Sequence, residues 1–249
     1  MMQITPTVKQ LLIINILFFI GSELVGEGAY NYLALFFFEN AKFQFWQPLT
    51  HMFMHGGIMH IAFNMFALYS FGSALEHFWG AKKFLFFYIS CGLGAALLHT
   101  GVNYFIFHDG LDTLTQAGFA KVDIFNLLNE GKLDTRWTDI LGVSGMDRFA
   151  GSFASPAVGA SGAIYGLLVA FAYMFPNAEL ALMFIPVPIK AKYFVPGLLV
   201  VDLFLGVSGK SIFGGASGIA HFAHIGGAIV GFLMMWYWKK NEFNRNRWN

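Results

Sequence analysis

The sequence has few charged residues and almost no cysteine. Charged residues make up 12% of its 249 positions, about half of the ~25% usual in soluble domains, and the mean hydropathy is +0.58. The single cysteine, Cys91, excludes an internal disulfide and any multi-cysteine zinc site. A net charge of +1 provides no basic field for nucleic acid. With 18% aromatic residues, these values indicate an integral membrane protein.

Six apolar segments are candidates to cross a bilayer, which takes ~20 residues. The fifth is short and contains Pro196, Gly197 and Asp202. No small-residue cleavage site follows the first, so we expect it to be retained as a span rather than removed as a signal peptide. The predicted fold is therefore an all-α integral membrane bundle of six helices, over residues 10–30, 57–78, 84–107, 157–175, 194–208 and 219–238.

Lysine and arginine set the expected orientation. The short loops of one side and the terminal segments carry nine of them, against two, Lys42 and Lys210, in the short loops of the other side. Cytoplasmic loops carry the excess, so both termini are predicted to be cytoplasmic. We expect one multi-pass membrane domain over residues 1–249, in the cell (inner) membrane if the protein is bacterial.

A long non-cytoplasmic insertion is predicted at about 109–156, between spans three and four. Within it, KVDIFNLLNE favours a short amphipathic helix, followed by sequence that contains glycine and serine. A long loop of this kind is usually either functional or disordered, and the sequence is compatible with both. The oligomeric state is equally open.

Several polar residues lie inside predicted spans, where their energetic cost makes each a candidate functional residue. His60 and Asn64 on span two are four residues apart and share one helix face. His55 lies ~140° further round that helix. We interpret His55 and His221 as structural, and His99 on span three is a further candidate. For the polar residues of span two, the alternative is interhelical hydrogen bonding.

Spans four and six carry complementary patterns. GASGAIYG, residues 159–166, places glycines around Ser161, which leaves its hydroxyl and the nearby backbone N–H groups accessible. AHFAHIGGAIVGF carries His224 before Gly227 and Gly231, and the GxxxG spacing lets two helices approach closely. The pattern is either a packing seam alone or a seam that brings His224 beside Ser161.

A seam that brings His224 beside Ser161 would have a chemical consequence. A serine becomes a useful nucleophile when a neighbouring base takes its proton, and histidine is the usual base. Acyl transfer also needs hydrogen-bond donors where the oxyanion forms. His60, Asn64 and the Ser161 backbone N–H could supply those donors.

HGGIMHIAFN, GASG and AHIGGAIVG, in this order, resemble the motifs of the rhomboid family of intramembrane serine proteases. The resemblance covers roughly residues 45–238 apart from the insertion. It implies a six-helix rhomboid-like bundle and a serine endopeptidase that cleaves transmembrane protein substrates within the lipid bilayer. It implies no cofactor, no metal and no nucleic-acid partner.

The resemblance also implies roles for individual residues. Ser161 would be the nucleophile and His224 the general base of a catalytic dyad. Gly159 would border the oxyanion hole, and Glu76 would be structural. The other implied supporting residues are His60 and Asn64, which would hold the oxyanion, and Tyr165, which would stack on the catalytic histidine.

The sequence departs from the family pattern in three places. The loop between spans one and two offers Phe45-Trp46 in place of a Trp-Arg pair, which leaves its role open. The insertion is longer than a minimal family loop, and it would either shape substrate entry, dock a partner or be a solvated decoration. The short fifth span resembles the family's mobile lateral gate, beside which a substrate would enter, but Asp202 within it is unassigned and faces either the bundle interior or a water-filled cavity.

Other function classes stay open. Histidines on three spans could ligate a metal or a haem, although this leaves the glycines around Ser161 unexplained. A non-catalytic rhomboid-like adaptor or chaperone would typically lack the serine or the histidine, and both are present here. A transporter is a further alternative, without the internal repeat that many transporters show.

Overall fold

Helices account for most of the described chain. The computed structural model describes residues 3–182, 185–209 and 220–245. Lys210 and Arg247, which entered the charge comparison, lie outside these ranges. The α-helices are α1 (Pro6–Val25), α2 (Glu27–Leu33), α3 (Gln47–Thr50), α4 (Ile58–Ala67), α5 (Ser73–Trp79), α6 (Ala81–Gln116), α7 (Lys121–Asn129), α8 (Arg136–Ala154), α9 (Ser161–Met174), α10 (Ala191–Ser208) and α11 (Ala220–Arg245).

Long apolar helices form a membrane bundle. Five described stretches are long and apolar enough to cross a bilayer: α1, the continuous helical stretch Ile58–Trp79, α6, α10 and the Ala220–Lys240 part of α11. Ile58–Trp79 joins α4 to α5 through a π-helical turn, η2 (Leu68–Gly72). The sixth candidate, α9, is apolar but has only 14 residues. The multi-pass helical bundle is confirmed, and the count of six spans stays a prediction.

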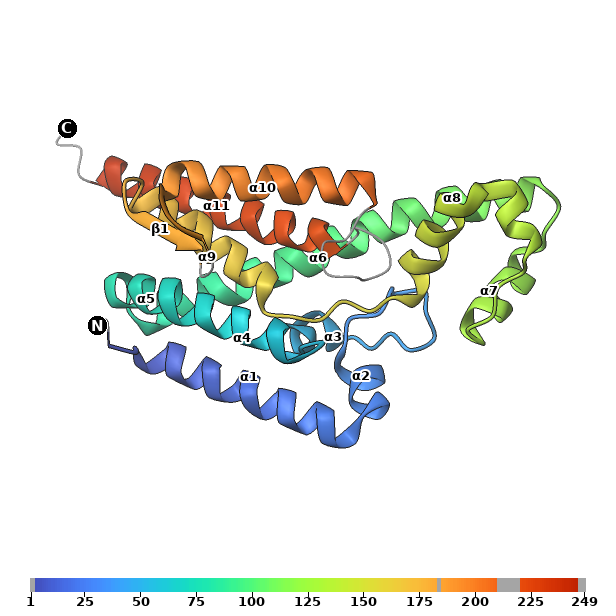
Figure 1. The fold of residues 1–249 in the computed structure, drawn as a ribbon, viewed down its shortest axis with the longest axis horizontal. Coiled ribbons are helices and arrows are strands. Elements are labelled where there is room, and N and C mark those ends of the chain that lie inside the picture. Colours follow the sequence, from blue (N-terminus) through green and yellow to red (C-terminus); the bar gives the residue numbers. More distant parts are fainter. Residues whose placement is uncertain (1–2, 183–184, 210–219, 246–249) are drawn as a thin grey trace.

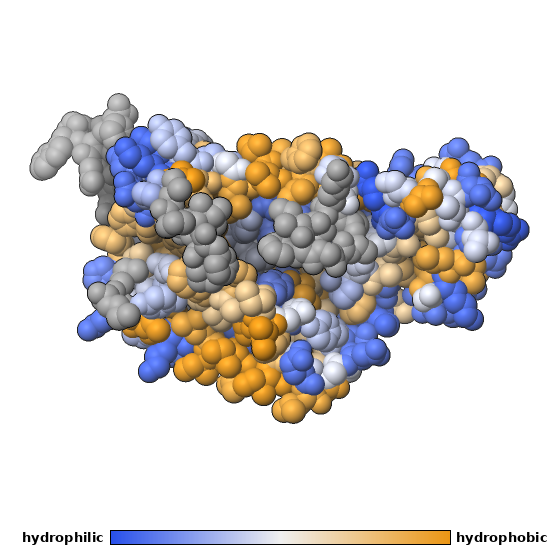
Figure 2. Space-filling model, in the orientation of Figure 1, coloured by the Kyte–Doolittle hydropathy of each residue, from blue (hydrophilic) through white to orange (hydrophobic). Residues whose placement is uncertain are grey.

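The outer surface of the bundle is apolar. Large hydrophobic side chains are exposed on several of the long helices, including Leu17 on α1, Phe105 on α6 and Phe204 on α10. Figure 2 shows hydrophobic residues across the middle of the molecule, with hydrophilic residues gathered at the end formed by α7 and α8. Exposed apolar side chains on helices of this length are the surface that a bilayer solvates. The start of α1 and the end of α11 lie at the same end of the bundle (Figure 1).

Small residues bring the central helices into backbone contact. A Cβ added at Gly227 on α11 would overlap the carbonyl oxygen of Gly162 on α9. One at Gly231 would lie 2.8 Å from the Gly166 Cα. Toward α6, a Cβ at Gly226 would lie 2.6 Å from the carbonyl oxygen of Gly94. Helix α11 is therefore wedged between α6 and α9 at a separation that only glycine permits.

The expectation of an all-helical chain misses one small sheet. Strands β1 (Glu179–Leu182) and β2 (Ile185–Lys190) pair antiparallel between α9 and α10, with Glu179 opposite Lys190. The segment was too short to show a clear alternating pattern, and its two prolines are residues that strands accommodate only at an edge. A two-stranded sheet has only edges, so it can hold them.

The predicted insertion is folded around an extension of α6. This helix has 36 residues and so is about 54 Å long, well beyond the ~30 Å of a bilayer core. Its last residues, together with α7 and α8, enclose a cluster of ten buried residues that includes Phe107, Trp137, Phe149 and Phe153. Helix α7 matches the predicted amphipathic segment. Helix α8 was not predicted, because its glycines weaken a helical pattern; Gly142 (φ +69°) kinks it.

An extended linker connects α8 to the start of α9. Ala157 in this linker exchanges two backbone hydrogen bonds, of 2.9 and 2.8 Å, with Leu35, which lies between α2 and α3. Just before the linker, the Asn40 side-chain amide donates to the Phe153 carbonyl at 2.9 Å. Because the segment between α2 and α3 holds this linker, the N-terminal end of α9 has a defined position.

At the other end of the bundle, Glu76 joins the second predicted span to α1. Its carboxylate accepts the backbone N–H groups of Thr7 and Val8, at 3.0 and 2.9 Å, and the hydroxyl of Thr5 at 2.5 Å. These N–H groups belong to the first turn of α1 and have no partner inside the helix. The carboxylate therefore closes that helix end.

Candidate active site

Ser161 is the first residue of α9, and the glycine two positions before it has a special backbone. Gly159 has φ +127°, in the region that favours glycine. A Cβ here would lie 2.9 Å from His60 Nε2. The Gly159 N–H donates to the carbonyl of His51 at 2.9 Å. The chain can therefore turn into α9 beside the His60 ring only with glycine at this position.

Ser161 and His224 meet across the seam between α9 and α11. Ser161 Oγ lies 3.0 Å from His224 Nε2. The ring of Tyr165, one turn after Ser161, stacks on the His224 imidazole with centroids 4.2 Å apart and planes 8° from parallel. The close approach of the helices at Gly227 and Gly162 brings the two side chains within hydrogen-bond distance. The His224 side chain keeps 21% of its surface exposed, so the pair is not sealed inside the bundle.

His60 reaches the same place from α4. The Gly56 backbone N–H donates to its Nδ1 at 3.3 Å, so in a neutral ring the proton is on Nε2. This Nε2 is the His60 atom nearest to the position that a Cβ on Gly159 would take. Ser161 Oγ lies 3.5 Å from that same position, so His60 and Ser161 border one small space. Asn64 lies one turn further along α4, and its amide donates to the His60 carbonyl at 2.8 Å. One N–H of that amide is left for another acceptor.

His55 and His99, which the sequence also singled out, contact other polar side chains. His55 was predicted on span two but precedes α4, because Gly56 and Gly57 interrupt the helix; its ring meets the His60 ring edge-on at 5.2 Å. On α6, the Asn103 amide donates to His99 Nε2 at 3.2 Å.

His51, outside the spans, is a buried histidine that the sequence reading did not single out. Its Nδ1–H donates to the Gln47 carbonyl at 3.1 Å. Burial lowers its pKa to about 4, outweighing the opposite effect of that hydrogen bond. The ring is therefore neutral near pH 7, and the residue serves the site through its carbonyl, which holds Gly159.

Asp202 is the residue whose surroundings the sequence left open. It lies on α10, is 4% exposed and faces the bundle interior. Its Oδ1 lies 2.5 Å from His221 Nδ1 and 3.1 Å from His224 Nδ1. The sequence did signal a functional role for Asp202, because an aspartate in an apolar span is energetically costly. What the sequence did not show is how α10 is rotated relative to α11, which decides the partner.

These three residues also form a group with metal-ligand chemistry. One oxygen of Asp202 and one ring nitrogen each of His221 and His224 lie within 4.8 Å of one another. Carboxylate oxygen and imidazole nitrogen are common zinc ligands. Among the described residues, this is the place where a metal ion would find three protein ligands.

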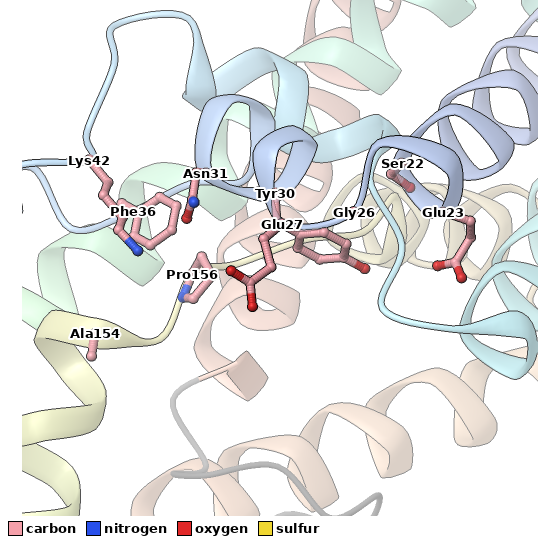
Figure 3. Close-up of a pocket in the computed structure, with 10 residues that line it drawn as sticks. All are labelled: Ser22, Glu23, Gly26, Glu27, Tyr30, Asn31, Phe36, Lys42, Ala154 and Pro156. Carbon is pink, nitrogen blue, oxygen red and sulfur yellow. The ribbon is translucent and has the colours of Figure 1, made fainter. Parts of the chain in front are cut away.

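A separate cavity of about 470 Å³ lies between α2 and the segment that precedes α9. Figure 3 shows Glu27 and Tyr30 on the α2 side and Ala154 and Pro156 on the other. The Tyr30 hydroxyl donates to the His55 carbonyl at 2.7 Å, and burial together with the nearby Glu23 charge raises the pKa of that hydroxyl. The cavity is lined by residues other than the Ser161 group and is not its binding pocket.

Comparisons with known proteins identify the family of the chain. The Rhomboid domain profile matches residues 42–241. The chain is 26% identical over 188 residues to Rhomboid protein 1, mitochondrial, of Saccharomyces cerevisiae, covering 76% of this chain and 40% of that protein. It is 28% identical over 199 residues to Rhomboid protease AarA of Providencia stuartii, covering 76% and 54%. The chain thus spans about half the length, or less, of these relatives. Since the profile covers most of the sequence, the protein belongs to the rhomboid family.

Proposed function

We propose that the protein is an intramembrane serine endopeptidase that hydrolyses peptide bonds in transmembrane segments of other membrane proteins. Ser161 is the nucleophile and His224 the general base. The observation that carries the proposal is the 3.0 Å separation of Ser161 Oγ and His224 Nε2. Membership of the rhomboid family, with a relative named as a protease, supports the same reaction class.

The reaction follows from these two groups. Ser161 Oγ forms a bond to the substrate carbonyl carbon while its proton passes to His224 Nε2, and the carbonyl electron pair moves to the oxygen. When the tetrahedral intermediate collapses, the C–N bond breaks and His224 gives its proton to the leaving amine. Water then attacks the acyl-serine by the same route and releases the second product. The partial exposure of His224 is consistent with water reaching the pair.

Donors for the oxyanion are available on one side of Ser161. His60 Nε2–H borders Gly159, and the Ser161 backbone N–H is free of intrahelical bonding because it begins α9. Asn64 has one unused amide N–H. We assign these three groups to the oxyanion, because donors that are already oriented stabilise charge as it develops. Gly159 keeps the space open, and Tyr165 holds the plane of the His224 ring.

A substrate helix has to open before it reacts. In an intact helix, every carbonyl in the membrane is hydrogen-bonded and enclosed by its neighbours. Segments with helix-breaking or small residues near their outer end are therefore the favoured substrates.

Cleavage in proteoliposomes tests the proposal. The protein of residues 1–249 is reconstituted with a set of single-span substrates, half of them carrying a helix-breaking pair near the outer end. The products are mapped by mass spectrometry. We expect cleavage inside the span that disappears in Ser161→Ala and persists in Ser208→Ala, a hydroxyl at the exposed end of α10. Cleavage that survives in Ser161→Ala would overturn the proposal.

The cluster of Asp202, His221 and His224 supports a second candidate, a metal-binding membrane protein. Metal analysis of the purified protein decides between the two. A stoichiometric metal in folded protein that cleaves no substrate would favour the metal-binding reading. Chelator-resistant cleavage would favour the serine protease. Intact protein with neither metal nor cleavage would favour a non-catalytic adaptor.

A further inference from the structure

Three side chains from three helices are joined by short contacts at the candidate site, with His224 between the other two. Ser161 on α9 is 3.0 Å from one ring nitrogen of His224 on α11, and Asp202 on α10 is 3.1 Å from the other. The Asp202 side chain is 6% exposed, so little water competes for that contact. The resemblance from sequence implied only the first two members.

We propose that Asp202 is the positioning residue of this site, which makes it a Ser161–His224–Asp202 triad rather than a dyad. The inference rests on the proposed function. It adds that the base is oriented from α10, a helix that contributes neither the nucleophile nor the base.

The chemistry of the contact decides which tautomer His224 adopts. An ionised carboxylate can only accept hydrogen bonds, so Asp202 Oδ1 stabilises the ring with its proton on Nδ1. The lone pair is then on Nε2, which faces the Ser161 hydroxyl. This is the tautomer that a general base needs. Without an acceptor at Nδ1, the ring would be free to carry its proton on Nε2 and would then block the transfer.

The same contact stabilises the intermediate. When His224 takes the serine proton, both of its ring nitrogens carry hydrogen and the ring is positive. Asp202 then pairs with a full charge in surroundings of low polarity, where such a pair is stronger than in water. The aspartate keeps its own negative charge throughout, so the proton balance involves only Ser161, His224 and the leaving amine.

A second histidine fixes the carboxylate. His221 precedes His224 by three residues, on the same face of α11, and its Nδ1 lies 2.5 Å from the same oxygen of Asp202. Two ring nitrogens from α11 within hydrogen-bond distance of one oxygen hold Asp202 Oδ1 in place. His221 therefore acts on the aspartate rather than on the serine.

The alternative is that Asp202 only joins α10 to α11. Asp202→Asn separates the two readings, because asparagine has the same size and still forms hydrogen bonds, so it preserves the joint. It carries no charge to pair with the imidazolium, and its amide can donate to Nδ1 and favour the wrong tautomer. In a serine protease of another fold, the corresponding change lowers kcat about 10⁴-fold.

The kinetic test compares Asp202→Asn with Asp147→Asn, an exposed aspartate on α8, in proteoliposomes with one transmembrane substrate. We expect Asp202→Asn to lower kcat by about 10²- to 10⁴-fold at nearly unchanged KM and melting temperature, and Asp147→Asn to match the wild type. Wild-type kcat in a folded Asp202→Asn protein would overturn the triad while leaving the serine protease intact.

A spectroscopic test reads the tautomer without turnover. The protein is labelled with ¹⁵N-histidine, and the His224 signals are assigned by their loss in His224→Ala. We expect Nδ1 protonated and Nε2 unprotonated in the wild type at neutral pH, with the proton on Nε2 gaining population in Asp202→Asn. A wild-type His224 with its proton on Nε2 would overturn the inference, even if Asp202→Asn did not fold. If the tautomer is as expected but Ser161→Ala still cleaves, the proposed function fails instead.

Discussion

The centre of the bundle and the folded insertion are held together in opposite ways. Around Ser161, α9 and α11 touch through backbone at Gly162 and Gly227, and no side chain lies between them at that point. In the insertion, α6 and α8 are separated by large rings such as Phe107 and Phe149, which stack at 5.1 Å and 6°. The first kind of contact leaves the two backbones little room to shift, and a misplacement of ~1 Å can already slow a reaction about 10²-fold. The second supplies stability through buried area.

The largest expected effect is on the chemistry at the centre. We expect His224→Ala to lower kcat for a transmembrane substrate by about 10⁴-fold or more, since loss of the base in other serine proteases has effects of this size. His77→Ala is the matched control, because His77 is exposed on α5. Rates in proteoliposomes and melting curves of both variants provide the check. A folded His224→Ala protein with near wild-type turnover would remove the reason for the close contact between α9 and α11.

A side chain at the backbone contact comes next. We expect Gly227→Val to prevent stable folding, because its Cβ overlaps the Gly162 carbonyl and backbone cannot move aside as a flexible side chain would. A cost above ~4 kcal/mol is expected for overlap of this kind.

The control for this variant is Gly101→Ala on α6, where a new Cβ meets nothing within 4 Å. A helix-interior alanine there is expected to be neutral or to stabilise by up to ~1 kcal/mol. Thermal unfolding in the same detergent compares the two. Equal stability of both variants would show that the α9–α11 contact is looser than described.

A mutation in the hydrophobic cluster of the insertion is expected to destabilise the insertion alone. Phe149 is 1% exposed, and we expect Phe149→Ala to cost the α7–α8 region about 3–5 kcal/mol while Ser161 stays reactive, because the ties at Leu35 and Asn40 hold the linker before α9. Hydrogen exchange is expected to rise in α7 and α8 and to stay unchanged in α9.

Val143→Ala on the same helix, at a side chain that is 70% exposed, is expected to leave both regions unchanged. Loss of Ser161 reactivity in Phe149→Ala would show that the insertion and the centre of the bundle are not independent.

The smallest effect concerns pH. The pKa of His51 is about 4 in the folded protein and ~6.5 when unfolded, so the unfolded state binds more protons between these values. Its contribution to stability is present above about pH 6.5 and is lost as the pH falls toward 4. We expect the melting temperature to fall over this range, and to fall less in His51→Gln. The exposed His77→Gln is expected to follow the wild type, and an unchanged pH slope in His51→Gln would contradict the assignment.

Much of the site was predictable because helical spacing carries it. His60 and Asn64 are one turn apart on a single helix, and the glycines beside Ser161 and after His224 predict two helices in close contact. What spacing cannot supply is the rotation of one helix against another, which decided the partner of Asp202. The start of α4 after His55 was missed for a related reason, because glycines inside an apolar run leave the helix end undefined.

The insertion was less predictable for a different physical reason. The long α6 continues past the apolar stretch that marked the predicted third span, where hydropathy no longer reports on helix length. Helix α8 depends on packing against α6, since Gly142 and its neighbours weaken any local preference for a helix. That residues 1–249 form one membrane domain, with both termini cytoplasmic, stays a prediction.

The measurement that tests the central claim most directly is the reaction of the purified protein with a fluorophosphonate, followed by mapping of the modified residue. Such a probe forms a stable bond only with a serine whose proton is removed by a neighbouring base. The account predicts a single adduct on Ser161, absent in both Ser161→Ala and His224→Ala. Folded protein that takes up no probe, or that labels equally well in His224→Ala, would contradict it.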